Sequence, residues 1–289
     1  MRANILSIAA AVVAITLLTA CNVTDPIYNT SHSGQAQITV TTDWSGIGTG
    51  IVKPAEYYAA YASNELKATQ DQYTFPNLFA PGSYTILFYN KPAGITISQT
   101  FAMANYAAPI GWLFTARMQE TVEADKDYAF TVQMQQQVRQ LTLVIEPMGG
   151  SKDKIESITA VLSGVADIYD MESDTHGTSS IAHGSPSNIA LTFSKITSGA
   201  DAGKWSATVR LLGVAGAAQS LTGTITFTGG TPVDLALKSD LTTSLAQFNN
   251  DKKTPLSLGG TVVETPTGAG FTATINDWTK VTGIPGTAN

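Results

Sequence analysis

The feature that most constrains the fold of this chain is an alternation of apolar and polar residues with a period of two. Between residues 37 and 44, every second side chain is the less polar one, at Ile38, Val40, Thr42 and Trp44. This period is that of a β-strand with one buried face, because successive side chains of a strand point to opposite sides. The Ser45-Gly46 pair is predicted to end the strand.

Runs of the same kind recur along the chain and are separated by Pro, Gly, Asn or Asp. They lie at residues 57–62, 72–75, 83–90, 95–101, 128–134, 138–147, 155–162, 188–196, 204–212, 220–228, 256–263 and 270–275. Many short strands between turn residues are typical of a β-sandwich. The sequence therefore predicts an all-β fold.

The run at 83–90 has apolar side chains on both faces. Tyr84, Ile86 and Phe88 share one face, and Leu87 and Tyr89 share the other. Because a strand with one solvated face alternates apolar and polar residues, this pattern predicts a strand that is covered on both sides.

One helix is predicted in the folded part of the chain, at residues 240–249. Leu241, Leu245 and Phe248 follow helical spacing. Asp240 stands before them and is suited to cap the first turn.

The composition is that of a β-rich extracellular protein. Hydrophobic residues make up 43% of the chain and charged residues 13%, which excludes a disordered tail. The formal net charge is −6, and it becomes −7 when residues 1–20, whose only charged residue is Arg2, are removed. Nucleic acid is excluded as a partner, because its recognition depends on clustered Lys and Arg.

The N-terminal residues have the pattern of a bacterial lipoprotein signal peptide. Arg2 precedes an uncharged run from Ile5 to Ala20, whose 16 residues fall short of the roughly 20 that span a membrane. Leu18 and Ala20 suit a lipobox in front of Cys21, the only cysteine of the chain. We predict cleavage between Ala20 and Cys21 and lipid attachment to Cys21. The alternative is a secreted or cytosolic protein with an isolated cysteine.

Length and composition divide the chain into four predicted segments. Residues 1–20 are the signal peptide, and residues 21–35 form a polar tether. The 269 residues that follow cleavage exceed the usual size of one domain. We place an N-terminal β-sandwich at 36–137 and a C-terminal β-sandwich at 138–289, with the boundary just after three consecutive glutamines.

No catalytic apparatus is recognisable in the sequence. The three histidines, His32, His176 and His183, all fall outside predicted strands. Neither a Gly-x-Ser-x-Gly nucleophile elbow nor a Gly-x-x-x-x-Gly-Lys phosphate loop is present. Paired carboxylates of a glycoside hydrolase remain open, because such residues meet only in the folded chain. We predict a protein that is not an enzyme and has no cofactor.

A long polar loop is predicted at residues 166–187. It carries the acidic and imidazole side chains of Asp167, Asp170, Glu172, Asp174, His176 and His183. Their spacing matches neither a calcium-binding EF-hand loop nor a zinc motif. A solvated loop is favoured over a metal site, and no metal ligand is assigned.

Aromatic residues offer two interpretations. Four tryptophans, at Trp44, Trp112, Trp205 and Trp278, could stack on sugars, and so could the group Tyr57, Tyr58 and Tyr61. Most of the tryptophans lie in or beside predicted strands, where aromatic rings usually fill a sandwich core. The core interpretation is favoured, with at least one of the adjacent tyrosines facing outward.

Several segments, in this order, resemble one family of proteins. They are the lipobox at Cys21, His32, the strand ending in Asp43-Trp44, the strand at 81–90, Val138-Arg139-Gln140-Leu141, residues 155–158, residues 162–166, Asp240-Leu241-Thr242 and residues 275–278. Together they span most of the mature chain. The pattern is similar to that of the FimB-type fimbrial anchor lipoproteins of Bacteroidales, which cap or tether a type V pilus.

The resemblance implies two tandem transthyretin-like Greek-key β-sandwich domains that follow a lipoprotein signal peptide and a short tether. It implies lipid anchorage in the outer membrane, exposure on the cell surface and a role in adhesion at the base of a fimbrium, without cofactor or small-molecule substrate. Fimbrial subunits would be the partners, and a strand from one subunit would complete the sheet of the next.

We expect this chain to accept such a strand and to donate none. The tail from Thr279 to Asn289 is short and contains Gly283, Pro285 and Gly286, which suit a strand poorly. Two alternatives remain open from sequence. One is a surface glycan-binding lipoprotein that works beside an outer-membrane transporter, and the other is an adhesin that binds host protein directly.

Overall fold

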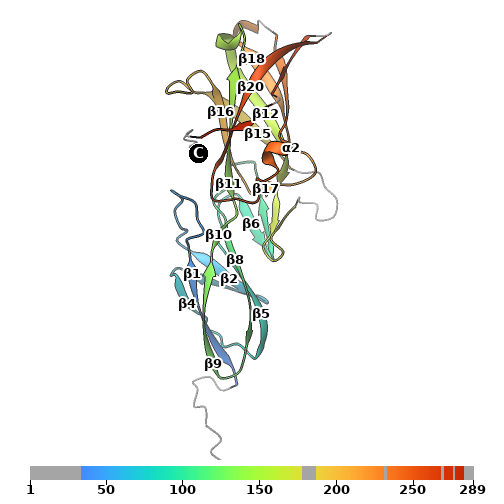
Figure 1. The fold of residues 1–289 in the computed structure, drawn as a ribbon. Coiled ribbons are helices and arrows are strands. Elements are labelled where there is room, and N and C mark those ends of the chain that lie inside the picture. The colour runs from blue at the N-terminus through green and yellow to red at the C-terminus, as the bar shows by residue number, and fades with distance from the viewer. Residues whose placement is uncertain (1–33, 178–186, 231–232, 268–269, 276, 283–289) are drawn as a thin grey trace, which may run out of the picture.

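The computed structural model describes residues 34–177, 187–230, 233–267, 270–275 and 277–282. Nearly every regular element in these ranges is a β-strand, so the predicted all-β class is confirmed. Figure 1 shows an elongated molecule in which an N-terminal half, residues 34–137, and a C-terminal half, residues 138–282, lie end to end. No helix in these ranges is long and apolar enough to cross a membrane.

Two sheets face each other in the N-terminal half. The first has the order β4-β1-β9, with strands at Gln72–Thr74, Ala36–Asp43 and Lys126–Gln133. The second has the order β10-β8-β5-β2-β3, with strands at Gln135–Gln136, Phe114–Val122, Gly82–Tyr89, Tyr57–Tyr61 and Asn64–Ala68. Inward side chains of both sheets form one core that includes Ile38, Phe75, Phe88 and Phe114.

A third layer covers the outer face of β5. This small sheet has the order β14-β13-β7-β6, with strands at Thr175–Gly177, Ile168–Asp170, Phe101–Ala104 and Ile95–Ser98. Ile86 and Phe88 belong to the sandwich core, while Leu87 and Tyr89 pack in a separate cluster with residues of the third layer. The prediction that this strand is covered on both sides is therefore confirmed.

The C-terminal half forms a closed ring of strands. Its strands are β11 (Arg139–Pro147), β12 (Ile155–Ala166), β15 (Ser187–Lys195), β16 (Trp205–Leu211), β17 (Gly213–Val214), β18 (Ser220–Phe227), β19 (Leu235–Asp240), β20 (Leu256–Thr267), β21 (Gly270–Thr274) and β22 (Thr279–Lys280). The sheet runs β11-β16-β15-β12-β18-β19-β21-β20, and β11 pairs with β20 as well as with β16. That second pairing returns the sheet to its starting strand.

Two long strands make this closure possible because they change partners along their length. β15 pairs with β12 up to Phe193 and with β16 from Ser194. β20 pairs with β11 up to Val262 and with β21 from Val263. One apolar core fills the ring, with buried side chains from all of its principal strands.

The helix prediction is correct in place and wrong in length. α2 covers only Thr242–Leu245, and the other helical pieces of the described residues are single 3₁₀ turns at Lys152–Lys154 and Thr228–Gly230. Asp240 does act near the helix start, because its carboxylate accepts a hydrogen bond from the Thr242 amide at 2.8 Å. Leu241, Leu245 and Phe248 are buried in the ring core, so their spacing reflects packing more than helix length.

The prediction of a polar loop at residues 166–187 is also partly wrong. β13 and β14 form a hairpin at 168–177, and β13 pairs with β7 of the N-terminal half. Backbone pairing therefore crosses residue 137, although the main cores on either side of it are separate. The predicted division into a tether, a first sandwich and a second sandwich, and their transthyretin-like topology, stay predictions.

Candidate functional site: an open sandwich side and a junction cleft

The N-terminal sandwich has two free sheet edges on one side, at β8 and β9. β8 pairs with β5 along its whole length, but its other edge pairs with β10 only at Phe114 and Thr115. β9 pairs with β1 on one edge, and no strand of the described residues pairs with the other. Free edges present unpaired N–H and C=O groups, which are a template for another strand. We call the free edges of β8 and β9 the open side.

Side chains along the open side leave the sandwich core incompletely closed. Tyr128 and Phe130 of β9 pack against the core but are only half-buried, with their rings stacked at 5.6 Å between centroids. On β8, Glu120 lies between the buried Met118 and Val122 in the inward series, yet it is exposed. An inward charge on an edge strand also discourages unspecific pairing.

The other edges of this half are short or charged. β4 has three residues, and β3 carries Glu65 and Lys67. Glu65 accepts a hydrogen bond from the Tyr89 hydroxyl at 2.6 Å and forms an ion pair with Lys91 at 2.7 Å. Charges and short length are the usual protection of sheet edges. The open side is therefore the long edge that is available for a partner strand.

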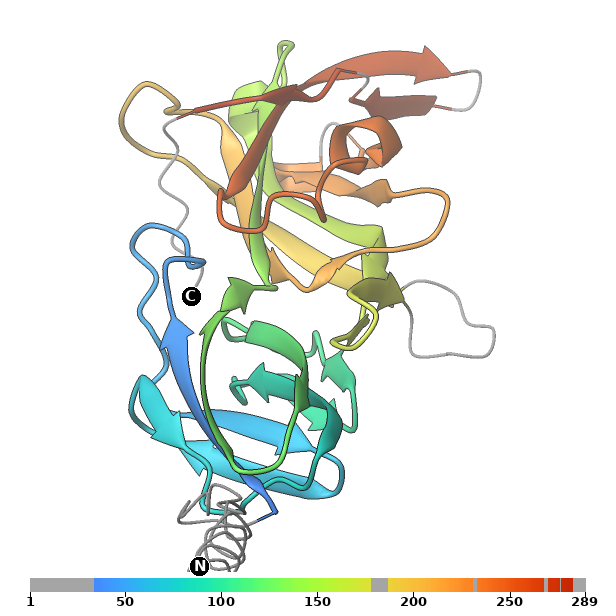
Figure 2. The same ribbon diagram turned by 60° about the horizontal axis from the view of Figure 1, so that its bottom comes forward.

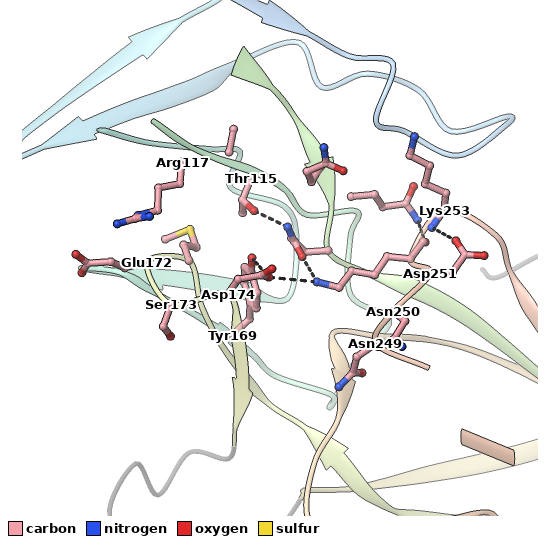
Figure 3. Close-up of a pocket in the computed structure, with 16 residues that line it drawn as sticks. Thr115, Arg117, Tyr169, Glu172, Ser173, Asp174, Asn249, Asn250, Asp251 and Lys253 are labelled. Atoms are coloured by element: carbon pink, nitrogen blue, oxygen red, sulfur yellow. Dashed lines mark hydrogen bonds and ion pairs between the residues drawn. The ribbon is translucent and has the colours of Figure 1, made fainter. Parts of the chain in front are cut away.

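A cleft of about 600 Å³ lies where the open edge of β8 reaches the C-terminal half. We call it the junction cleft (Figure 3). Its walls come from β8 residues 115–117, the three glutamines at 135–137, the β13–β14 turn and residues 249–253. Arg117, Lys252 and Lys253 balance Glu172, Asp174 and Asp251, and five amide side chains complete the lining. The cleft has a mixed lining and carries no excess of either charge.

Lys252 is the centre of the hydrogen bonding across the junction cleft. Its ammonium group donates to the Gln137 side chain, lies 3.8 Å from an Asp174 carboxylate oxygen and stands 4.8 Å from the centre of the Tyr169 ring. Burial lowers the pKa of Lys252, and Asp174 opposes this shift. The Tyr169 hydroxyl donates to Asp174 at 2.8 Å, and burial raises the pKa of Tyr169. These groups satisfy one another and hold the two halves together.

The glutamines hold three segments at the junction. Gln136 donates to the backbone carbonyls of Val138 and Lys252, at 2.8 and 2.6 Å, and accepts from the Gly48 amide at 2.9 Å. Gln137 donates to Thr115 at 2.7 Å. The loop after β1 is thereby held against the C-terminal half, and Figure 2 shows it reaching in that direction. The glutamines just before the predicted domain boundary are therefore a polar connection, in which Gln136 and Gln137 are buried and their side-chain amides are hydrogen-bonded.

Arg139 fixes the segment that supplies Lys252. It is buried, donates to the carbonyls of Thr254 and Phe248 at 2.7 and 2.9 Å, and lies over the Phe248 ring. Burial lowers its pKa, and the carboxylate of Asp251, at 3.9 Å, opposes this shift. The guanidinium group of Arg139 is therefore surrounded by two backbone carbonyls, a carboxylate and an aromatic ring.

The site residues predicted from sequence lie mainly elsewhere. Ala20 and Cys21, as well as His32 and His183, lie outside the described residues. His176 is half-buried, its buried Nε2 atom has no hydrogen-bond partner, and burial lowers its pKa to about 4. Of the acidic residues of the predicted loop, Glu172 and Asp174 line the junction cleft. The described residues hold no group of three metal-binding side chains.

The aromatic residues mostly fill the cores, as the favoured interpretation predicted. Trp205 and Trp278 are buried in the ring, and Trp44 packs edge-on against Tyr57. Trp112 is half-buried. Among the tyrosines, Tyr57 and Tyr61 are buried, whereas Tyr58 faces outward, stacks on Tyr89 and carries Lys91 over its ring.

β8 is the functional element that the sequence prediction missed. Its residues alternate between the buried Phe114, Met118 and Val122 and the exposed Arg117 and Gln119, but Thr115 is buried and Glu120 is exposed against the pattern. The deviations arise because one end lies in the junction and the other borders the open side. A weak period of two over nine residues was the available signal.

The fold defines the class of protein first. It is similar to a candidate adhesin from Bacteroides ovatus, with 14% identity and a TM-score of 0.57 over 80% of this chain and 89% of that one. It is also similar to the fimbrial anchor protein Mfa2 from Porphyromonas gingivalis, with 12% identity and a TM-score of 0.54 over 83% and 95% of the two chains. At such identities the likeness shows the fold alone, which is an all-β sandwich fold.

A match in sequence then gives the family. The model of the fimbrillin-A associated anchor proteins Mfa1 and Mfa2 matches residues 55–282, and the chain belongs to this family. No curated protein matches the sequence. The resemblance to fimbrial anchors is confirmed, and it gives the protein a fimbrium-associated role in adhesion at the cell envelope. The family is one of anchor proteins and not of enzymes.

Proposed function

We propose that this protein is a non-enzymatic anchor or accessory subunit of a fimbrium, held in the outer membrane by lipid on Cys21. The family supports the fimbrial part of this proposal. The sequence around Cys21 supports the lipid part, because a lipobox ends the apolar N-terminal run at the only cysteine. Acyl chains on Cys21 then carry the load between the membrane and the folded part of the chain.

The open side is the proposed acceptor for a strand from a pilus subunit. Two adjacent free edges are present there, and the half-buried rings of Tyr128 and Phe130 lie between them and the core. An added strand gains main-chain hydrogen bonds from a free edge and packs its alternate side chains on the rings. The single observation that carries this proposal is the free edge of β8 and β9 beside an incompletely closed core.

The start of the C-terminal tail supports acceptance without donation. Thr279 and Lys280 form β22, which pairs with Gly259 and Leu258 of β20. The Val281 amide donates to the Ser257 carbonyl at 3.0 Å. These residues complete the sheet of their own chain, so they are not free to complete a neighbour. Polymerisation of the purified mature protein by itself would contradict this part of the proposal.

The experiment that tests strand acceptance is affinity capture of the acylated protein from its native outer membrane. The wild-type chain is compared with Phe130→Ser on the open side and with Val161→Ser, which changes an exposed apolar residue on the outer face of the ring. We expect fimbrial subunits to co-purify with the wild type and Val161→Ser but not with Phe130→Ser. Equal recovery with all three would place the contact elsewhere.

Lipid anchorage has a separate test. Cys21→Ser removes the thiol that carries the lipid, and we expect the variant to leave the membrane fraction without loss of the folded core. An unchanged membrane fraction would show that another part of the protein holds it there. A matched control is Ser33→Ala, which lies in the predicted tether and leaves the lipobox intact.

A glycan-binding lipoprotein is the second candidate function, favoured by the amide-rich junction cleft. One similar structure is a candidate polysaccharide-binding protein from Bacteroides thetaiotaomicron, with 6% identity and a TM-score of 0.54 over 78% of this chain and 92% of that one. Recovery of a transporter and glycan-degrading enzymes in the capture experiment, in place of fimbrial subunits, would favour this function over the anchor.

A further inference from the structure

A second pocket, away from the open side, contains an arginine that forms no ion pair with a described carboxylate and whose Nε atom has no hydrogen-bond partner. The pocket measures about 230 Å³ and lies between β15 residues 189–192, β16 residues 207–210 and the loop at 106–110. β15 and β16 pair only at Ser194–Ser206 and Lys195–Trp205, so the two strands part beyond these residues. The pocket fills the gap where they part. Arg210 is on its wall.

Arg210 is half-buried and differs from Arg139, the buried arginine of the ring. Arg139 donates to two backbone carbonyls and lies near a carboxylate. The Nε atom of Arg210 is buried with no hydrogen-bond partner, and no described carboxylate forms an ion pair with this residue. Partial burial lowers its pKa, with no acidic group opposing the shift. A buried donor without a partner is rare in folded proteins. The terminal nitrogens of the Arg210 guanidinium form no hydrogen bond with a described residue either, so they are the atoms that can bind a ligand in the pocket.

The surroundings fix the Arg210 guanidinium in place. It lies 5.4 Å from the centre of the Trp112 ring, a cation–π distance. The Tyr106 hydroxyl at the end of the pocket is fully used, since it donates to the Ala166 carbonyl at 2.7 Å and accepts from the Leu212 amide at 3.0 Å. Thr192 and Thr208 add hydroxyl groups to the lining, and the Thr208 hydroxyl also shares a hydrogen bond of 3.0 Å with that of Thr142. The pocket is therefore a fixed cation with neutral hydroxyl groups beside it.

We propose that this pocket binds the carboxylate of a small hydroxylated acid, of which a uronic acid is the simplest sugar representative. The planar guanidinium binds a carboxylate through two parallel hydrogen bonds. The threonine hydroxyls suit the hydroxyl groups of the ligand. The pocket is smaller than the roughly 300 Å³ at which sites for drug-sized ligands begin, so it accepts one monosaccharide unit and excludes a longer one.

Calorimetric titration of the full mature chain with glucuronate, glucose and acetate tests the proposal. We expect saturable binding of glucuronate, weaker binding of acetate and none of glucose. Arg210→Gln should weaken glucuronate binding by at least about tenfold, because a charge-assisted hydrogen bond is lost. Lys195→Gln, which removes an exposed positive charge from β15 outside the pocket, should leave the affinity unchanged.

A second variant keeps the test decisive if Arg210→Gln fails to fold. Thr208→Val preserves the charge and should weaken glucuronate more than acetate. Absence of saturable glucuronate binding, or binding that neither variant changes, would overturn the proposal. Equal affinity for acetate and glucuronate would overturn the assignment to a sugar acid. This pocket shares no residue with the open side, so its failure leaves the fimbrial proposal standing.

Discussion

The two halves of the molecule differ in how their β-sheets end. In the C-terminal half, β11 pairs with both β16 and β20, so the sheet returns on itself and its principal strands form a ring. In the N-terminal half, β8 and β9 keep long free edges beside half-buried aromatic rings. A closed sheet has nowhere to add a strand, whereas an open one has. The comparison assigns the contact with a partner subunit to the N-terminal half.

Strand length accounts for much of the difference. β20 has 12 residues and passes from pairing with β11 to pairing with β21 after Val262, with Gly259 and Gly260 just before this change of partner. A side chain at Gly259 would press on Val281, and one at Gly260 would press on Ile275 and Trp278. The longest strands of the N-terminal half have 8 or 9 residues and stay within one sheet. Their sheets therefore end in edges.

The largest expected effect is on the closed ring. Gly223 lies on β18, and an added Cβ would come within 2.1 Å of the Thr159 carbonyl oxygen and 2.6 Å of the Ala160 Cα. Because both are backbone atoms of the neighbouring strand, Gly223→Ala must force the two strands apart. We expect the free energy of unfolding to fall by about 4 kcal/mol or more. Urea unfolding measures this. Gly150→Ala, with no atom within 4 Å of its Cβ, is the control and should change little.

The second-largest expected effect is a loss of stability in acid, at the β13–β14 hairpin that joins the halves. His176 has a pKa of about 4 in the folded protein, chiefly through burial and then through the charge of Lys252, against 6.5 ordinarily. Between pH 6.5 and 4, the His176 side chain is therefore protonated in the unfolded chain but not in the folded chain. Stability should fall through this range by about 3 kcal/mol and level off below it.

Urea unfolding at pH 7.5 and 4.5 measures the acid effect. His176→Gln cannot titrate at this position, so its stability should depend less on pH than that of the wild type. The same pH dependence in both proteins would assign the acid sensitivity to other groups.

A smaller effect is expected at the contact between the loop at 105–113 and the ring. The Tyr106 hydroxyl bonds to Ala166 and Leu212 at the same time. Tyr106→Phe leaves a buried carbonyl and a buried amide without this partner, which costs about 1–3 kcal/mol. Thermal unfolding checks the value, and Tyr84→Phe, whose exposed hydroxyl donates to the Ala80 carbonyl, is the matched control. A loss that is equal in both would contradict the special role of Tyr106.

The smallest effect on stability should come from the open side itself. Phe130 is half-buried, so Phe130→Ser gives up only part of a side-chain transfer free energy, about 1 kcal/mol. Its effect on partner binding should be much larger than this. If Phe130→Ser unfolds as readily as Gly223→Ala, the open side is part of the core and the comparison between the halves fails.

Local patterns predicted the interior strands well. β1, β5 and β11 are found where alternating or apolar runs placed them, because each is paired on both edges and its side chains meet a core. β8 was missed, and the hairpin at 168–177 was taken for part of a loop. Both lie at borders where polar residues face a cleft or a partner strand, and their patterns are mixed for that reason.

The closure of the ring and the unbonded Nε atom of Arg210 were beyond prediction from sequence. Closure depends on the pairing of β11 with β20, more than a hundred positions apart, and on two strands that change partners. Arg210 looks in the sequence like any solvated residue of a strand. Only the parting of β15 from β16 and the position of Trp112 show that its Nε atom is buried and unbonded.

Hydrogen–deuterium exchange of the full mature chain, with and without its co-purified fimbrial subunit, tests the central claim most directly. We predict new protection of backbone amides in Phe114–Val122 and Lys126–Gln133, with the amides of β11, β16 and β20 unchanged. Complex formation without protection of β8 and β9, or with new protection confined to the ring, would contradict the assignment of strand acceptance to the open side.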